Sequence, residues 1–421
     1  MKLLFAPMAS SSLAHMARLF AIADEMKDRG HEILFTSSTE RKEFIVQSGY
    51  EVYSRTYLPV NFNDPKDQSL NYLKAKRDNF KDWFATEIEA AEHFEAQLVI
   101  SSPGFLGPHV TFKTNIPTLA VINAPYLAES VGVLGLSLTE NSLRHQLLRS
   151  FIKPKFEKKF TSQYVTQIVE IYKELGIDFY GKNRTQLYEC MDIVIPGMYE
   201  LEPVEPKDAY YYSGPLFWKG FEKNTECSEE MIKDFKGEDT LIYLSFGGSI
   251  FNLDFYNHIF ELIAKLPYKF LVSTGLNFSL TEFTYNKKNT RVYRFVPGLK
   301  ACKLSDVVIN TGAHGTVMQA LRYAKPMICI PCNIDQSFYA YRVEELGLGI
   351  NINKTSITRF AHRESYYKLN PNLDKEIISG ISEILTAPKY KHQTMKYSVM
   401  LRRQGSGVKN IGNYIESRYG Y

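Results

Sequence analysis

The sequence lacks the features that would place it in several common protein classes. No apolar run reaches the about 18 residues that a membrane-spanning helix needs. The chain has only 5 cysteines, an odd number without the spacing of a disulfide framework. Its 50 basic residues are nearly balanced by 46 acidic ones, which does not favour nucleic-acid binding. We therefore expect no transmembrane helix, no disulfide framework and no nucleic-acid partner.

The cysteines also give no sign of a metal site. Cys329 and Cys332 are spaced as CxxC, but a zinc site needs a second such pair, and a thioredoxin-type site needs a helix that starts at the motif. Here the pair ends a strand expected at Met327–Ile330. We interpret both as incidental thiols and expect no bound metal.

The first residues, MKLLFAPMASS, predict a β-strand rather than a signal peptide. The apolar run Leu3–Phe5 is too short for the core of a signal peptide. An amphipathic helix follows, with Met16, Leu19 and Phe20 on one face, and a second strand is expected after Gly30. This order is typical of a Rossmann-like half, although GxGxxG is missing. Because the start is interpreted as a strand and not as a signal peptide, we expect a cytoplasmic protein.

Length and pattern predict two α/β domains. A chain of 421 residues is too long for one comfortable core, and strand-like segments alternate with helical ones in both halves. The strands expected in the first domain are Leu3–Ala6, Glu32–Thr36, Gln97–Ser101, Thr118–Asn123 and, as the last, Asp192–Pro196. Those expected in the second are Thr240–Phe246, Lys269–Ser273, Arg291–Phe295, Asp306–Asn310, Pro326–Ile330 and Gly349–Ile352. The segment Pro203–Lys223 is interpreted as the connection, and both sheets are expected to be parallel and doubly wound.

The run Thr311-Gly312-Ala313-His314-Gly315-Thr316 and the pair Asp335-Gln336 carry most of the functional information. The run lies between a strand-like and a helix-like segment, so its backbone N–H groups and the helix dipole would face an anion. Polyphosphate is the ligand that we expect there. A carboxylate beside an amide suits neighbouring sugar hydroxyls. Phosphate and sugar together predict a nucleotide-sugar ligand.

The stretch TGAHGTVMQALRYAKPMICIPCNIDQSFYAYRVEELGLG resembles the donor-binding signature of the UDP-glycosyltransferase superfamily, the family 1, bacterial-type inverting enzymes of GT-B fold. The resemblance implies two Rossmann-like domains that face each other across a cleft. The expected parts are an acceptor-binding domain 1–215, a linker 216–238, a nucleotide-sugar domain 239–403 and a C-terminal helix 404–421 that returns to the first domain. It also implies a metal-independent hexosyltransferase that uses a UDP- or dTDP-sugar as co-substrate and no cofactor.

The same resemblance assigns the donor contacts. The residues implied in phosphate binding are Gly248, Ser249, Thr311, Gly312, Ala313, His314, Gly315 and Thr316. The nucleoside is expected at Thr274, Val296 and Gln319, and the sugar at Asp335 and Gln336. Each assignment has an alternative, because both glycine loops are also typical of plain turns and Asp335 is also a candidate N-cap.

The run departs from the family pattern at three places. Thr311 replaces a histidine that contacts the pyrophosphate, Ala313 replaces a glycine, and Gln319 replaces a glutamate that binds the ribose. An amide can still hold ribose hydroxyls, with less charge, and His314 is a candidate substitute for the missing histidine.

His15 is the candidate general base. It lies in the first turn of a helix after the first strand, where the helix dipole disfavours imidazolium. The resemblance places it on the catalytic histidine of a G-H-x-x-P motif, which here reads Ala14-His15-Met16-Ala17-Arg18. The family's aspartate partner is replaced by Ser102, which can form a hydrogen bond but cannot offset charge. The alternative is a surface or capping histidine.

The sequence therefore predicts transfer of a sugar, with inversion, to a hydroxyl of a small apolar or aromatic acceptor. One rival is a non-catalytic GT-B protein that binds nucleotide-sugar or activates a partner. Another is a lipid-acceptor transferase at a membrane face, suggested by basic and apolar residues over 144–159, although a solvated helix is the favoured interpretation there. The sugar, the base and the oligomeric state are left open.

Overall fold

The structure is a computed structural model, and its described residues fall into two compact units. It describes residues 1–7, 13–37, 39–54, 77–102, 108–127, 165–179, 181, 184–204, 206–220, 227–247, 252–275, 277–332, 334–352 and 370–420. Unit 1 holds the described residues up to Trp218 and from Gly405 onward, and unit 2 holds those in Lys219–Gln404.

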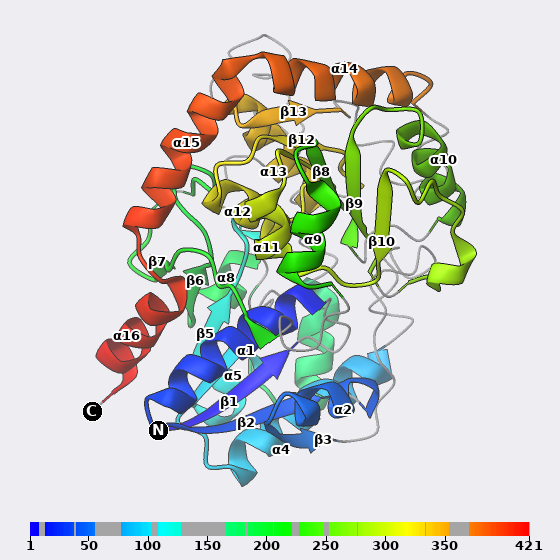
Figure 1. Ribbon diagram of the computed structural model, residues 1–421. Helices are drawn as coiled ribbons and strands as arrows, with labels where there is room; N and C mark the ends of the chain where they lie inside the picture. Colours follow the sequence, from blue (N-terminus) through cyan, green and yellow to red (C-terminus); the bar gives the residue numbers. More distant parts are fainter. Residues whose placement is uncertain are drawn as a thin grey trace. The chain divides into compact units, whose positions relative to one another are not determined.

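Unit 1 is a seven-stranded, fully parallel sheet with helices packed on it (Figure 1). Its strands are β1 (Lys2–Pro7), β2 (Glu32–Ser37), β3 (Glu51–Ser54), β4 (Leu98–Ser102), β5 (Thr118–Val121), β6 (Asp192–Ile195) and β7 (Tyr210–Tyr212). Its helices are α1 (Leu13–Asp28), α2 (Thr39–Gln47), α4 (Arg77–His93), α5 (His109–Thr114), α8 (Arg184–Tyr188) and α16 (Gly407–Tyr419). The strands follow the order β3-β2-β1-β4-β5-β6-β7.

Unit 2 repeats this architecture with six parallel strands. They are β8 (Leu241–Ser245), β9 (Lys269–Ser273), β10 (Thr290–Tyr293), β11 (Val307–Asn310), β12 (Met327–Cys329) and β13 (Gly349–Asn351), in the order β10-β9-β8-β11-β12-β13. The helices are α9 (Glu229–Lys236), α10 (Leu253–Ile263), α11 (Gly298–Leu304), α12 (His314–Arg322), α13 (Ile334–Glu345), α14 (Leu373–Thr386) and α15 (Pro388–Arg403). The predicted pair of doubly wound parallel sheets is thus confirmed.

The strand sequences explain why both sheets are parallel and covered on their two faces. In β1, Leu3, Leu4 and Phe5 are all fully buried, although successive side chains point to opposite faces of the sheet. Continuous apolar runs of this kind are typical of strands with helices on both sides. In each sheet the strand order reverses at one place, between β1 and β4 and between β8 and β11. Ligands of open α/β sheets bind at the carboxyl edge beside such a reversal.

Strands β3 and β7 of unit 1 were not predicted, and β7 overturns one expectation. Asp192–Pro196 was expected to be the last strand, and the segment that follows it was expected to be a connection. Instead Tyr210–Tyr212 forms β7, a seventh strand paired parallel to β6. Tyrosine favours strands, and all three side chains have partners: the Tyr211 ring stacks on Tyr414 at 4.4 Å, the Tyr212 hydroxyl donates to the Glu202 carbonyl, and the Lys207 ammonium group lies 5.6 Å from the centre of the Tyr210 ring.

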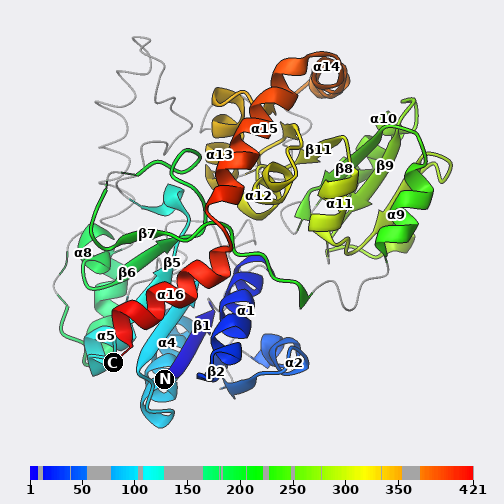
Figure 2. The same ribbon diagram turned by 60° about the vertical axis from the view of Figure 1, so that its left-hand side comes forward.

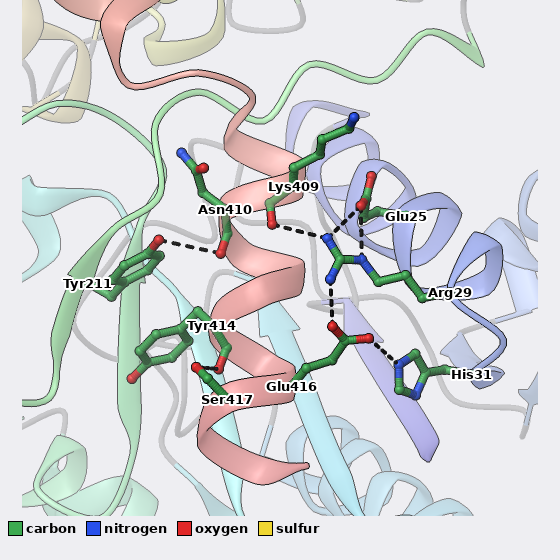
Figure 3. Close-up of polar contacts among 9 residues, drawn as sticks. All are labelled: Glu25, Arg29, His31, Tyr211, Lys409, Asn410, Tyr414, Glu416 and Ser417. Atoms are coloured by element: carbon green, nitrogen blue, oxygen red, sulfur yellow. Dashed lines mark hydrogen bonds and ion pairs between the residues drawn. The ribbon is translucent and has the colours of Figure 1, made fainter.

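The C-terminal helix α16 packs on α1 and β7 of unit 1 (Figures 2 and 3). Glu416 lies between two side chains from the end of α1 and the start of β2, at 2.6 Å from the Arg29 guanidinium and 3.2 Å from the His31 ring. The hydrogen bond from His31 and the ion pair with Arg29 lower the pKa of Glu416. Arg418 and Tyr419 both bond to Asp192, the first residue of β6. The last helix is therefore tied to unit 1 by polar contacts near both of its ends, those near its start involving Lys409 and Asn410, and by ring stacking at its middle.

None of the helices in the described part of the chain is long and apolar enough to cross a membrane.

Candidate active site

The residues predicted to act fall into two clusters, one at the strand-order reversal of each unit. In unit 1 the carboxyl ends of β1 and β4 lie side by side, because Ala6 pairs with Ser101 and Pro7 with Ser102. The chain leaves β1 for α1, which starts at Leu13. The first turn of α1 therefore lies near the end of β4.

His15 and Ser102 meet at this point. The Nδ1 atom of the half-buried His15 is 3.3 Å from the Oγ atom of Ser102, which is fully buried. A serine hydroxyl can accept from an Nδ1–H group, and this tautomer leaves the Nε2 lone pair as the proton acceptor. His15 and Ser102, which are 87 residues apart in the sequence, are therefore in hydrogen-bonding contact.

The start of α1 disfavours a positive charge on His15. The first turn of α1 contains no acidic residue, and the partial positive charge at a helix N-terminus disfavours imidazolium. Ser102 orients the ring without supplying a negative charge. Through this contact the ring can be oriented to take up a proton, and the neutral hydroxyl of Ser102 does not itself offset the charge of imidazolium.

A second polar pair, which the sequence analysis missed, lies one helical turn further along α1. Arg18 Nη1 donates to Asn123 Oδ1 at 2.7 Å, and the two side chains are only 5% and 3% exposed. Asn123 follows β5, the neighbour of β4. The only sequence signal was that arginine occupies the position of the motif's proline.

In unit 2 the predicted phosphate run forms a turn between β11 and α12. The N–H group of Gly312, at φ +79°, donates to Asn310 Oδ1 at 2.6 Å, an Asx-type bond that the Asn-Thr-Gly sequence favours. Helix α12 begins at His314, and Ala313 at its N-cap makes no side-chain capping bond. The first helical bond runs from Val317 to the Ala313 carbonyl. The N–H groups of the first turn have no acceptor within the helix, which suits an anion.

Two further features mark this turn as a ligand site. The Oγ1 atom of Thr311 is fully buried and has no hydrogen-bond partner among the described residues, which is costly unless a ligand or water supplies one. A Cβ atom added to Gly315 would meet nothing within 4 Å, so there is open space beside the helix start. Thr316 is half-buried in the same turn.

The predicted sugar pair packs directly on this turn. A Cβ atom at Gly312 would lie 2.4 Å from the backbone carbonyl of Gln336, so only glycine permits the contact. Gln336 is buried, and its Oε1 atom accepts from the Cys332 N–H group at 2.8 Å. Half-buried Asp335 is the second residue of α13 rather than its N-cap, and its charge is favourable in a first helical turn. The phosphate turn and the sugar pair are therefore parts of one cluster.

The predicted nucleoside residues are only partly brought together. A Cβ atom at Gly298 would lie 2.2 Å from Gln319 Oε1, so Gln319 lies against the turn that contains buried Val296. Thr274 is fully buried, and its Oγ1 atom faces the Gly275 and Tyr293 carbonyls at 3.5 Å. The Gln319 amide is thus near the turn of Val296, where the nucleoside is expected, whereas the Thr274 hydroxyl faces backbone carbonyl groups.

The remaining predictions concern a second glycine loop, a basic stretch and a pair of cysteines. Gly248 and Ser249, and the basic stretch over 144–159, lie outside the described residues. Cys329 and Cys332 are buried free thiols, and burial raises the pKa of Cys329 to about 12. Among the described residues, no group of three or more His, Cys, Asp or Glu side chains could hold a metal ion.

The second half of the chain matches a known family. Residues 245–392 match the model of the glycosyltransferase family 28 C-terminal domain, a range that contains every described residue of the unit 2 cluster. The chain is 24% identical to the NDP-glycosyltransferase YjiC of Bacillus subtilis (strain 168), over 88% of this chain and 89% of that protein. It is 29% identical to the uncharacterized UDP-glucosyltransferase YdhE of the same organism, over 36% of this chain and 37% of that protein.

Solved structures share the whole architecture. The spinosyn forosaminyltransferase SpnP superposes with a TM-score of 0.69 over 100% of both chains, at 14% identity. The spinosyn rhamnosyltransferase SpnG, solved with thymidine diphosphate, superposes with a TM-score of 0.65 over 98% of this chain and 100% of that chain, at 12% identity. At such identities the likeness shows the fold, which is the GT-B fold of these glycosyltransferases.

Proposed function

We propose that this chain, a GT-B glycosyltransferase of the UDP-glycosyltransferase superfamily, transfers a sugar from a UDP- or dTDP-sugar to a hydroxyl group of a small apolar or aromatic acceptor, with inversion at the anomeric carbon. The observation that carries the proposal is the contact between Gly312 and Gln336. It joins an uncapped helix start, suited to a diphosphate, to a carboxylate–amide pair, suited to a sugar.

The unit 2 cluster would hold the donor and stabilise the leaving group. The N–H groups in the first turn of α12 point at the diphosphate, and the helix dipole favours the negative charge that grows as the glycosidic bond breaks. The buried Thr311 hydroxyl would donate to a phosphate oxygen. The Asp335 carboxylate would accept from sugar hydroxyls, and Gln319 would bond to the ribose. In this account no metal ion is required.

The unit 1 cluster would activate the acceptor. His15 Nε2 takes the proton of the acceptor hydroxyl while Ser102 holds Nδ1, and the oxygen attacks the anomeric carbon from the side opposite to the diphosphate. A single displacement of this kind inverts the configuration. General base catalysis contributes about 10²–10⁴-fold to rate.

Three observations on relatives support the donor and acceptor classes. SpnG has been solved with thymidine diphosphate and, separately, with spinosyn aglycone. YdhE is named as a UDP-glucosyltransferase. We propose the same two donor bases for this chain and leave the choice between them to experiment.

The test is acceptor-dependent release of nucleotide. Purified protein is mixed with UDP- or dTDP-sugars and with a panel of phenolic and sterol acceptors, with and without EDTA, and free UDP or dTDP is measured together with the anomeric configuration of the product. We expect release that requires acceptor, survives EDTA and gives an inverted product. Retention of configuration or loss of activity with EDTA would overturn the mechanism.

A non-catalytic role is the second candidate, and one observation favours it. Ser102 replaces the carboxylate that would support a charged His15, and the first turn of α1 contains no acidic residue. A protein that only binds nucleotide-sugar would show a higher melting temperature with UDP or dTDP and no acceptor-dependent release.

A further inference from the structure

Asn310, the last residue of β11, carries a buried amide group that has no acceptor for its hydrogens. The residue is fully buried, and its Nδ2 atom has no hydrogen-bond partner among the described residues. The Oγ1 atom of Thr311, the next residue, is likewise buried and unpartnered in the described part of the chain. A buried donor without an acceptor costs free energy. Two such donors in succession at the carboxyl end of a central strand point to a bound ligand.

The orientation of the Asn310 amide is determined by the donors around its oxygen. Oδ1 accepts from the Gly312 N–H group at 2.6 Å, and the thiol of Cys329 lies 3.7 Å from the same atom. Exchanging the oxygen and the nitrogen would put two N–H donors face to face. The backbone is fixed as well, because Asn310 pairs with Ser245 of β8 on one side and with Cys329 of β12 on the other. Nδ2 is therefore the available donor, and it lies beside the turn because it shares a carbon with Oδ1.

The turn next to this amide offers many donors and no acidic side chain. Helix α12 begins at His314, and no side chain caps its first N–H groups, which have no acceptor within the helix. The run from Asn310 to Thr316 contains no aspartate or glutamate. Donors without a carboxylate suit an oxyanion, whereas sugar hydroxyls, which must also donate, suit the Asp335 carboxylate. The chemistry of the turn therefore favours a phosphate oxygen as the acceptor for Nδ2.

The packing of the turn indicates which phosphate this is. Gly312, which bonds to Asn310, lies against the Gln336 carbonyl, since a Cβ atom there would come within 2.4 Å of it. Gln319, where the ribose is expected, lies five residues further along α12 and faces Gly298 instead. In a nucleoside-diphosphate sugar the β-phosphate carries the sugar and the α-phosphate carries the nucleoside. The Asn310 amide is thus on the side where the β-phosphate is expected.

We propose that Asn310 is a donor-binding residue whose Nδ2 atom donates a hydrogen bond to the β-phosphate, while its Oδ1 atom holds the Gly312 turn in place. The inference rests on the donor role proposed above for unit 2, and it adds a side chain that the sequence pattern did not single out. A hydrogen bond to a charged oxygen is stronger than one between neutral groups. The bond strengthens as negative charge grows on the leaving diphosphate, so Asn310 would assist its departure.

The experiment compares ligands that differ only in their phosphates. Asn310→Asp keeps an oxygen for the Gly312 N–H group and replaces only the NH2 group, by an oxygen that repels phosphate when ionised. Calorimetric titration is carried out with UDP, UMP and uridine, and with dTDP, dTMP and thymidine. We expect the variant to bind the diphosphates about 10–100-fold more weakly, and the monophosphates and nucleosides as the wild type does. Asn351→Asp makes the same change at a buried asparagine that ends β13, and it should leave all affinities unchanged.

A purely structural asparagine would give a different pattern. In that case Asn310→Asp would weaken all the ligands of a series equally or none of them, and either result would overturn the proposal. If this variant fails to fold, Asn310→Ser takes its place, because a serine hydroxyl can accept from the Gly312 N–H group in a similar turn but brings no NH2 group. The same selective loss is expected, and wild-type affinity for the diphosphates would contradict the proposal.

The titrations also separate this inference from the proposed function. Wild-type protein that binds neither diphosphate would overturn the proposed donor, and the role of Asn310 with it. Wild-type protein that binds a diphosphate, beside an Asn310→Asp variant that binds it equally well, would overturn the role of Asn310 alone.

Discussion

The two units share one strand order, but their polar clusters are built differently. Both have the strand order 3-2-1-4-5-6, counted within each unit, with one further strand in unit 1. In both, the polar cluster follows the strands at the reversal, β1 and β4 in one and β11 in the other. The unit 1 cluster is built from side chains, His15 with Ser102 and Arg18 with Asn123. The unit 2 cluster is built mainly from backbone, around Gly312 and the start of α12.

The difference shows that the strand order determines where a polar cluster lies, whereas the local sequence determines which chemical groups it presents. The sequence between Pro7 and Leu13 contains no glycine. The proposed proton acceptor of unit 1 is a side chain, whose protonation depends on nearby charge. After β11 the positive φ of Gly312 and the uncapped N-terminus present N–H groups, whose partial charges do not titrate. We expect substitutions in unit 1 to change rate and pH dependence, and substitutions in unit 2 to change donor affinity and stability.

The largest expected effect is the loss of the base. His15→Ala should lower kcat by about 10²–10⁴-fold, because it removes the proposed general base. Rates are compared at saturating donor. His392→Ala, which removes an exposed histidine of unit 2, is the matched control and should keep the wild-type rate.

Gly312→Ala tests the close backbone packing in the unit 2 cluster. The new methyl group would lie 2.4 Å from the Gln336 carbonyl at a φ of +79°, so the turn must shift, at a cost of about 1–3 kcal/mol. Calorimetry should show a lower Tm, and donor titration should show weaker binding. Gly315→Ala, in the same turn but beside open space, should keep the Tm. Equal losses in the two variants would contradict the role of close packing.

Ser102 variants test whether the contact with His15 affects rate and protonation in unit 1. Ser102→Ala removes the hydrogen bond that orients His15 and should lower kcat by about tenfold, as expected for a bond worth about 1–1.5 kcal/mol. Ser102→Asp would supply a carboxylate and should move the acid limb of the kcat/KM profile to higher pH, because a negative neighbour stabilises imidazolium. An acid limb that stays in place in Ser102→Asp would show that the contact does not govern protonation.

The smallest effect concerns the attachment of α16. The pKa of Glu416 is lowered in the folded protein by His31 and Arg29, so its contribution to stability is full above the ordinary carboxylate pKa and is lost as pH falls through the lowered value. Because Glu416 is 42% exposed, we expect this contribution to be below about 1 kcal/mol. Glu416→Gln should lower the Tm slightly at pH 7, and the difference from wild type should shrink as the pH falls below the ordinary carboxylate pKa. A difference that stays constant as the pH falls would point to packing instead.

The sequence predicted elements whose signal is local and missed those set by distant partners. Strand Lys269–Ser273, for example, was predicted to the residue. The seventh strand was missed because its support comes from β6 and from Tyr414 on α16, some 200 residues away. For the same reason the pattern could not reveal the bond from Arg18 to Asn123 or the packing of Gly312 on Gln336. His15 and Ser102 were singled out through family resemblance, since nothing local connects them.

The most direct test of the account is the donor affinity of His15→Ala, measured by isothermal titration with UDP and dTDP beside its rate. If unit 1 supplies the base and unit 2 binds the donor, the variant will bind nucleotide as the wild type does while its rate falls by about 10²–10⁴-fold. A parallel loss of affinity and rate would make His15 a structural residue and contradict the division of labour between the two units.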